Sequence, residues 1–224
     1  MSALAESLDE LGYAVVPGLV QPADCAALAA GWSDPALWRK RVVMQQHGFG
    51  RGEYRYFAYP LPPVVAALRR DLYGELAPLA NRWAEALRAS AEFPDSLEAY
   101  LSKCHAAGQT KPTPLVLRYE TGDYNCLHQD LYGAHVFPLQ ATVLLSDPSR
   151  DFAGGEFLLV EQRPRAQSRG TAVALARGDA VIFPVRERPR RGARGFHRAK
   201  LRHGVSTVRS GLRYTLGIIF HDAA

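Results

Sequence analysis

The second half of the chain, from Pro114 onward, consists of short runs of β-forming residues separated by Gly, Pro and Asp. Eight short strands within about a hundred residues are typical of a double-sheet jelly roll or barrel. The runs span residues 115–119, 124–128, 135–145, 156–160, 171–175, 180–183, 199–205 and 213–220. We therefore expect a mainly-β core over residues 113–221.

The first 112 residues are expected to be richer in helix, because their apolar residues recur at helical spacing. Strands are expected there only in GYAVVPGLV and in the aromatic, alternating segment 53–60. The length of 224 residues fits one domain, so we expect residues 1–224 to form a single mixed α/β domain with the N-terminal helices packed on one sheet. Helices are expected over residues 4–11, 23–32, 64–90, with an interruption near Pro78, and 95–106.

The composition excludes two broad classes of protein. With 47% hydrophobic and 22% charged residues, the chain is neither disordered nor a membrane protein. No apolar run approaches the roughly 18–20 residues that span a bilayer, and the N-terminus has acidic residues where a secretory signal has Lys or Arg. Three cysteines without a C-x-x-C pair suit a reducing compartment. We expect a cytoplasmic protein, with no membrane partner and no protein partner evident.

A candidate metal site is formed by His128 and Asp130, together with His203 on the last-but-one predicted strand. Positions i and i+2 of a strand point to the same face, so His128 and Asp130 can reach one ion. Two imidazoles and one carboxylate make the facial triad of non-haem Fe(II) oxygenases. We predict that these three residues are the metal ligands and the catalytic centre. The alternative for His128 and Asp130 is a hydrogen-bonded surface pair.

Strand spacing alone does not identify the third ligand, because several histidines follow Asp130 in the sequence. His203 is preferred because a glycine follows it and an arginine lies ten residues further on. Cys126 shares the parity of His128, and it is expected either near the metal or as a packing residue. The competing candidates for the third ligand are His135, His197 and His221.

The final predicted strand begins with Arg213-Tyr214-Thr215, which places Arg213 and Thr215 on one face. A guanidinium can hold a carboxylate through two hydrogen bonds, and a neighbouring hydroxyl can add a third. These two residues are candidates for binding the distal carboxylate of a dicarboxylate co-substrate. The alternative is that Arg213 is a strand-edge cation and Thr215 a β-branched strand residue.

Four linked motifs carry a family resemblance. The run LRYETGDYNCLHQD resembles the R-Y-x-x-G-x-x-x-x-x-H-x-D segment of 2-oxoglutarate/Fe(II) dioxygenases, and HG…GLRYT, AGGEF and RGDAVIFP resemble their later strands in the correct order. The resemblance covers about residues 113–221. It implies a double-stranded β-helix fold, Fe(II), and 2-oxoglutarate and O₂ as co-substrates. It also implies that Tyr119 contacts 2-oxoglutarate, as the matching tyrosine does in AlkB-type repair enzymes.

The resemblance also suggests a substrate. The whole chain, including the segments GRGEYRYFAYP and APLANRW, is similar to a bacterial oxygenase family described as acting on damaged DNA. This similarity implies oxidative demethylation of alkylated nucleic acid with release of formaldehyde. The AlkB pattern has two arginines beyond the distal histidine, whereas this chain has one at +10, as in prolyl-hydroxylase-like and phytanoyl-type relatives. The closest alternative is therefore a protein (prolyl-type) or small-molecule hydroxylase. Alternatives of another class are a non-enzymatic nucleic-acid-binding module and a cupin-like metalloprotein.

The basic residues are concentrated late in the chain. The net charge is +5, yet residues 163–213 contain 14 Lys or Arg and two acids, and residues 186–202 contain eight Lys or Arg and one Glu. We expect this last segment to lie at the rim of the site and to bind the phosphates of a nucleic acid, the alternative being a solvated basic surface. The candidate contacts are Arg190, Arg191 and Arg194.

The aromatic segment 53–60 offers a second candidate contact with substrate. Tyr54 and Tyr56 are predicted to stack on an extruded base. The alternative is that these rings pack the N-terminal part against the barrel.

Overall fold

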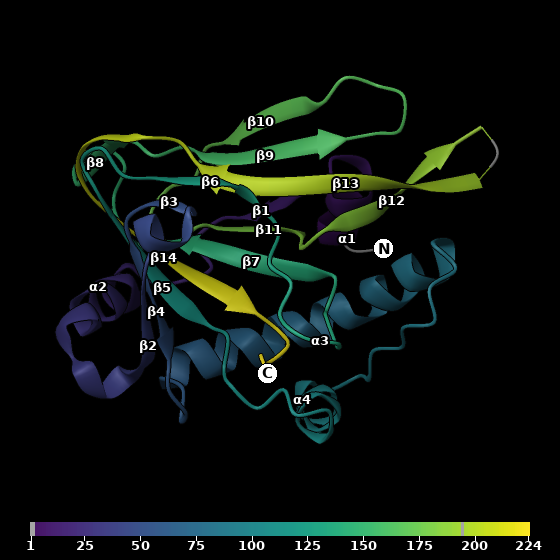
Figure 1. Ribbon diagram of the computed structural model, residues 1–224, viewed down its shortest axis with the longest axis horizontal. Coiled ribbons are helices and arrows are strands. Elements are labelled where there is room, and N and C mark those ends of the chain that lie inside the picture. The colour runs from purple at the N-terminus through teal and green to yellow at the C-terminus, as the bar shows by residue number, and fades with distance from the viewer. Residues whose placement is uncertain (1–2, 194) are drawn as a thin grey trace.

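The computed structural model describes residues 3–193 and 195–224 as two facing antiparallel sheets with helices packed outside one of them (Figure 1). The larger sheet has the order β1-β11-β7-β14-β5-β4-β2, with β8 beside β14. Its strands are β1 (Ala14–Val16), β2 (Trp38–Val43), β4 (Glu53–Phe57), β5 (Leu115–Glu120), β7 (Leu139–Leu144), β8 (Phe152–Gly154), β11 (Ala180–Pro184) and β14 (Val208–Ile219).

The smaller sheet has the order β10-β9-β13-β6-β3, with β12 beside β13. Its strands are β3 (Gly50–Arg51), β6 (Tyr124–His128), β9 (Phe157–Gln162), β10 (Arg169–Val173), β12 (Glu187–Gly192) and β13 (Gly195–Val205). The α-helices are α1 (Ala3–Glu10), α2 (Pro22–Ala30), α3 (Pro63–Ala86) and α4 (Leu97–Ala106), and the short 3-10 helices are η1 (Gly31–Ser33), η2 (Pro35–Leu37) and η3 (Met44–His47).

The main hydrophobic core lies between α3 and the outer face of the larger sheet. Leu72 and Leu76 of α3 belong to the same buried cluster as Val116, Val143 and Leu216 of the sheet. Figure 1 shows α3 running along this face beneath β7 and β14. The predicted packing of N-terminal helices on one sheet is therefore confirmed, and it leaves the inner face of the sheet free to form a site.

The interruption predicted at Pro78 is wrong, because α3 runs unbroken from Pro63 to Ala86. Proline removes one backbone hydrogen bond and crowds the preceding turn. Here Leu76, Leu79 and Trp83, before and after the proline, are all buried in the main core. Packing on both sides of Pro78 thus offsets the local preference for a break.

The eight strands predicted after Pro114 are all present, with boundaries shifted by a few residues. Four strands were not predicted, namely β2, β3, β8 and β12. All four are short or highly charged, and their conformation comes from pairing with a neighbour. The clearest example is β12, with the sequence ERPRRG, which pairs along its whole length with β13.

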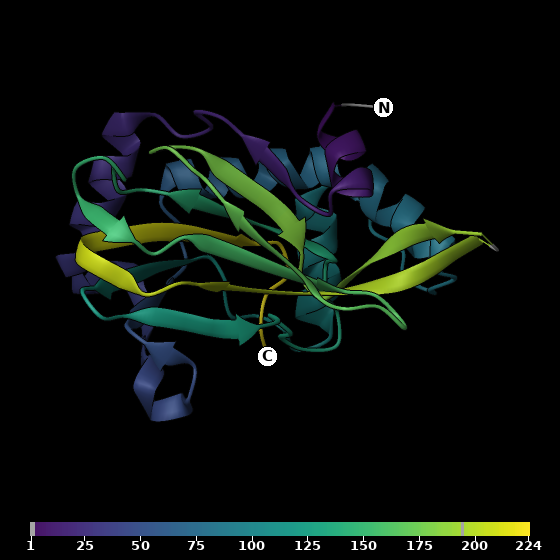
Figure 2. The ribbon, with the colours of Figure 1, turned by 90° about the horizontal axis from the view of Figure 1, so that it is seen from above.

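The hairpin of β12 and β13 projects beyond the body of the two sheets (Figures 1 and 2). Its other end is anchored, because β13 continues between β9 and β6 in the smaller sheet. The predicted contact residue Arg194 lies outside the described residues. No helix of the described chain combines the length and apolar character needed to cross a membrane.

Candidate metal centre

The three predicted ligands lie together between the two sheets. His203 on β13 is directly opposite His128 at the end of β6, and their ring centroids are 4.1 Å apart. Asp130 lies between them, with Oδ1 3.5 Å from His128 Nε2 and Oδ2 3.2 Å from His203 Nε2. The candidate ligand atoms of all three residues lie within 4.8 Å of one another, and no other group of this kind occurs among the described residues. The competing histidines are therefore not part of the cluster.

A β-bulge in β6 directs these side chains inward. His203 pairs with His128 and Val205 pairs with Asn125, so β6 has one more residue than β13 over this stretch. The strands approach closely here, since a Cβ at Gly204 would lie only 2.7 Å from the carbonyl oxygen of Asn125. The glycine after the distal histidine is thus required by packing. Cys126 is exposed and lines the same cavity as His128, so of its two expected places the one near the metal cluster describes it.

Neighbouring hydrogen bonds orient two of the candidate ligands. His128 Nδ1 is 2.8 Å from the carbonyl oxygen of Cys126, which can only accept, so Nδ1 carries a proton and Nε2 is the nitrogen that faces Asp130. The hydroxyl of Tyr132 donates to Asp130 Oδ1 at 2.8 Å. Tyr132 was not singled out from the sequence, although it lies two residues after Asp130.

The residue between His128 and Asp130 has a structural role. Gln129 Nε2 donates to the carbonyl oxygens of Leu201, at 2.7 Å, and Arg186, at 3.0 Å. These carbonyls lie where the partner of β13 changes from β12 to β6. Gln129 therefore fixes the end of β6 against β13.

The charges of the cluster suit metal binding. Burial raises the pKa of Asp130, but hydrogen bonds and charges from His128 and His203 outweigh it and hold that pKa well below its usual range. Burial, followed by the nearby charge of His128, lowers the pKa of His203. The Asp130 anion and a neutral His203 are the protonation states that a metal ion requires of its ligands. Burial lowers the pKa of His128, but the hydrogen bond and charge of Asp130 outweigh it and leave that pKa raised, so a metal ion would displace a proton there.

A cavity of about 360 Å³ adjoins the cluster and is lined also by Tyr119, Arg213 and Thr215. Arg213 is 2% exposed, and its Cζ lies 5.6 Å from the ring centroid of Tyr119 and 5.7 Å from that of Phe152. Burial lowers the pKa of Arg213 to about 10, so the guanidinium is charged at neutral pH. Among the described residues, its Nε and Nη1 have no hydrogen-bond partner.

The structure places the two tyrosines that were predicted to stack on a base in different surroundings. Tyr54 lines the cavity, whereas Tyr56 is only 6% exposed and packs between Arg39, whose Cζ is 4.5 Å from its ring centroid, and the edge of Tyr132. Tyr56 is therefore not available for stacking on a base. Its role is the alternative one, packing within the protein.

Two of the predicted arginines, Arg190 and Arg191, lie on the projecting hairpin and do not line the cavity. Arg190 pairs in register with His197, six residues from His203, which corresponds to roughly 20 Å along the strand. Arg190 also forms an ion pair with Glu161 at 3.3 Å, while Arg191 is exposed. The β12–β13 hairpin, which we call the basic arm, thus carries Arg190 and Arg191 away from the triad, whereas its Arg202 directly precedes His203 on β13.

The mouth of the cavity is instead lined by exposed apolar residues that the sequence analysis missed, namely Phe49, Leu127 and Leu131. The ring of Phe49 stacks on His47 with centroids 5.3 Å apart and an angle of 25° between the planes. The only local signal is a phenylalanine between two glycines, Gly48 and Gly50, in a segment that is otherwise unremarkable in composition.

Comparison with known proteins identifies a family and two relatives. A model of the family Oxygenase-NA, described as "Oxygenase, catalysing oxidative methylation of damaged DNA", matches residues 52–223. An uncharacterized protein of Mycobacterium tuberculosis is 52% identical over 194 residues, which cover 84% of this chain and 83% of the relative. The same values apply to an uncharacterized protein from a second strain of that species.

Two solved structures share the fold. A prolyl-4-hydroxylase of Pseudomonas putida has a TM-score of 0.56 at 13% identity, covering 96% of this chain and 95% of its own. An oxidoreductase of the 2OG-Fe(II) oxygenase family from Burkholderia pseudomallei has a TM-score of 0.54 at 19% identity, covering 99% and 91%. The predicted double-stranded β-helix fold is thereby confirmed.

Proposed function

The chain belongs to the Oxygenase-NA family, and from that premise we propose that it is an Fe(II)- and 2-oxoglutarate-dependent dioxygenase that oxidatively demethylates alkylated nucleic acid. Such an enzyme couples the decarboxylation of 2-oxoglutarate to succinate with hydroxylation of a substrate C–H bond. One observation carries the proposal. A cluster of two imidazoles and one carboxylate shares a cavity with a buried arginine whose Nε and Nη1 have no partner among the described residues.

The donor set fits ferrous iron. His128 and His203 provide imidazole nitrogens, and Asp130 provides a carboxylate oxygen, which is the ligand set of non-haem Fe(II) oxygenases and leaves coordination positions open. When bound there, iron supplies the activation of O₂. The protein orients two of these ligands through the Cys126 carbonyl and the Tyr132 hydroxyl.

Arg213 fits a carboxylate of the co-substrate. Burial of a charged group without a partner is costly, so two unpaired nitrogens on a buried guanidinium indicate a ligand that completes them. Thr215 lies on the same face of β14, also buried, and adds a hydroxyl. We assign the distal carboxylate of 2-oxoglutarate to Arg213 and Thr215. Tyr119, whose hydroxyl accepts a hydrogen bond from Asn125 Nδ2 at 3.2 Å, forms the adjoining wall.

Two surfaces support a nucleic-acid substrate. The outward side chains of the basic arm include Arg191, Lys200 and Arg202, which are exposed and can neutralise phosphates. At the mouth, the exposed ring of Phe49 can stack on an extruded base above the cavity. Together they provide separate contacts for the backbone and for the base.

Two further expectations become part of the proposal. We propose that residues 1–224 act as one catalytic unit, because β1, β2 and β4 from the first part are strands of the same sheet as β14. The three free cysteines, Cys25, Cys104 and Cys126, suit a cytoplasmic enzyme. The non-enzymatic alternative is set aside, since the family is one of oxygenases.

The test is succinate release, measured in parallel with methylated oligonucleotides, proline-containing peptides and free metabolites. We expect succinate and formaldehyde to form in equal amounts with a methylated oligonucleotide, and no formaldehyde with its unmethylated counterpart. The Asp130→Ala variant is the control for contaminating activity. Turnover of a peptide, with no stimulation by any methylated nucleic acid, would replace this substrate by the protein hydroxylase alternative.

A further inference from the structure

Asp130 differs from the other two candidate ligands in its local support. His128 and His203 belong to paired strands, whereas Asp130 lies two residues beyond the end of β6. Strand pairing therefore fixes the histidines but not the carboxylate. Its orientation depends on the loop that follows, and within that loop on the hydrogen bond from Tyr132 to Asp130 Oδ1.

A single side chain from elsewhere in the sequence holds this loop. Gln109, which follows α4, is buried, and its Oε1 accepts a hydrogen bond from the backbone N–H of His135 at 2.7 Å. Its Nε2 lies 3.1 Å from the carbonyl oxygen of Tyr132 and 3.0 Å from that of His135. One amide thus binds the backbone at both ends of the segment 132–135.

The loop is shaped to receive that amide. Gly133 has a φ of +99°, and a Cβ at this position would lie 2.5 Å from Gln109 Cδ. Any larger residue would displace the glutamine. Gly133 and Gln109 are therefore fitted to each other, which supports a specific role for this contact.

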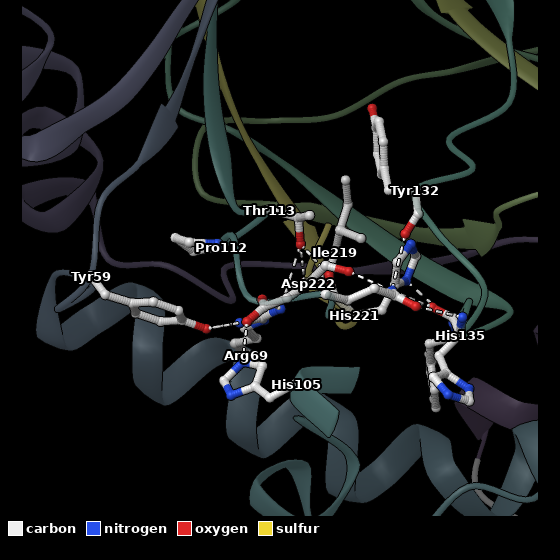
Figure 3. Close-up of polar contacts among 12 residues, drawn as sticks. Tyr59, Arg69, His105, Pro112, Thr113, Tyr132, His135, Ile219, His221 and Asp222 are labelled. Carbon is white, nitrogen blue, oxygen red and sulfur yellow. Dashed lines mark hydrogen bonds and ion pairs between the residues drawn. The ribbon is translucent and has the colours of Figure 1, made fainter. Parts of the chain in front are cut away.

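Gln109 also contacts a buried residue outside the loop. Its Nε2 is also 2.6 Å from the carbonyl oxygen of Asp222, a fully buried residue. Figure 3 shows the carboxylate of Asp222 held by Arg69 at 2.7 Å, His105 at 2.8 Å and Tyr59 at 2.9 Å. The amide of Gln109 is thus bonded to the buried Asp222 as well as to the loop that it holds.

We propose that Gln109 is a positioning residue for the metal ligand Asp130, acting through Tyr132; this inference rests on the proposed metal centre. Gln109 fixes the backbone of Tyr132, and the Tyr132 hydroxyl then donates its hydrogen bond to Oδ1 of Asp130. The other oxygen, Oδ2, is the one that faces His203. We call the contacts from Gln109 through Tyr132 to Asp130 the relay. The relay leaves Oδ2 as the metal-binding oxygen and holds that oxygen in place before a metal ion binds.

The test measures metal affinity and not turnover. Co(II) is titrated into the metal-free protein and followed by its d–d absorption, with the variants Gln109→Met, Tyr132→Phe and the double variant. Loss of a group that orients a metal ligand lowers affinity by about 10–100-fold. We expect each single variant to lie in that range, with an altered cobalt spectrum. The double variant is expected to bind about as weakly as a single one, because both act on the same bond.

A matched control separates positioning from general damage. Asn81 on α3 is another amide that holds a loop, donating from Nδ2 to the Phe93 carbonyl at 2.9 Å and accepting from the Phe93 N–H at 2.8 Å. It does not line the metal cavity. Asn81→Leu should lower the melting temperature and leave cobalt affinity and spectrum unchanged.

The outcomes are distinct. If the wild type binds cobalt and both single variants bind it equally well, or if their effects add in the double variant, the relay is wrong while the metal centre stands. If Gln109→Met does not fold, Tyr132→Phe and Gln109→Glu, which keeps the shape but loses the donor, decide the same question. If the folded wild type binds neither Co(II) nor Fe(II), the proposed function fails and the relay with it.

Discussion

Two buried arginines mark two regions of the molecule that are built for different purposes. Arg69 is 1% exposed and donates to Ile219 O at 2.8 Å, to the Tyr59 hydroxyl at 3.0 Å and to Asp222 at 2.7 Å. Arg213 is buried to the same degree, yet its Nε and Nη1 have no partner among the described residues. Protein groups compensate the first charge, and we propose that a ligand compensates the second.

The comparison teaches how to separate support from function. The region around Arg69, which we call the C-terminal support, consists of Tyr59, Arg69, His105, Thr113, His221 and Asp222 (Figure 3). Substitutions there should reduce stability first. Substitutions in the cavity should reduce binding or turnover and leave the fold intact. The predictions below test this division, from the largest expected effect to the smallest.

The largest effect is expected in the cavity. Asp130→Ala removes the only acidic member of the metal cluster, so turnover should fall by more than about 10³-fold. The metal-free variant should still fold cooperatively. Succinate release with iron supplied and urea denaturation measure the two quantities. Full succinate production by this variant would remove Asp130 from the metal centre.

In the C-terminal support, Arg69→Met should destabilise the protein by about 3–5 kcal/mol, because it leaves the buried carboxylate of Asp222 without its cationic partner. Urea denaturation measures the loss. The neighbouring Arg70 provides a matched control, since its ion pair with Asp71 is exposed and Arg70→Met should change stability little. Equal stability of the two variants would show that the buried pair has no special role.

The two regions also differed in how far the sequence predicted them. The triad, Arg213 and Thr215 could be predicted from the two-residue period of strands and from motif spacing, because both patterns are visible in short stretches of sequence. No short pattern marks Gln109 or Arg69, because their hydrogen-bond partners lie far along the chain. Gln109, for example, is bonded to Asp222, which is 113 residues later.

The remaining errors have similar causes. An alternating aromatic strand fits both an open and a buried ring, so the pattern did not separate Tyr54 from Tyr56. The sequence of β12 contains a proline and four charges and resembles a solvated loop, and only its pairing with β13 makes it a strand. The bulge in β6 depends on the close approach of Gly204.

The C-terminal support should also make stability depend on pH. Burial, and next the charge of Arg69, lowers the pKa of His221 to about 4 from its ordinary value of 6.5. Between these values the unfolded chain binds a proton that the folded protein does not, so stability is full above pH 6.5 and falls as pH drops toward 4. The shift corresponds to a loss of up to about 3 kcal/mol.

His221→Asn is the variant that isolates this effect. It keeps an acceptor for the Phe137 N–H, which His221 Nδ1 accepts at 3.2 Å, and removes the titrating group. Urea denaturation at several pH values should give a shallower decline for the variant than for the wild type. Parallel profiles would assign the acid sensitivity to other groups.

The smallest of these effects concerns Arg213 itself. Arg213→Met should raise the 2-oxoglutarate concentration needed for half-maximal turnover by about 10²-fold, the contribution of a charge-assisted pair to a carboxylate. Its stability should be unchanged or higher, because an unpaired buried cation is removed. An unchanged 2-oxoglutarate requirement, or a loss of stability as large as that of Arg69→Met, would contradict the contrast between the two arginines.

The most direct test of the central claim is an anaerobic titration of the metal-free wild type with Fe(II) and then 2-oxoglutarate. If His128, Asp130 and His203 hold the iron while Arg213 holds the co-substrate, a weak visible charge-transfer band should develop to one equivalent of each. The band should be absent from Asp130→Ala. A folded wild type that develops no band with both components present would contradict the account.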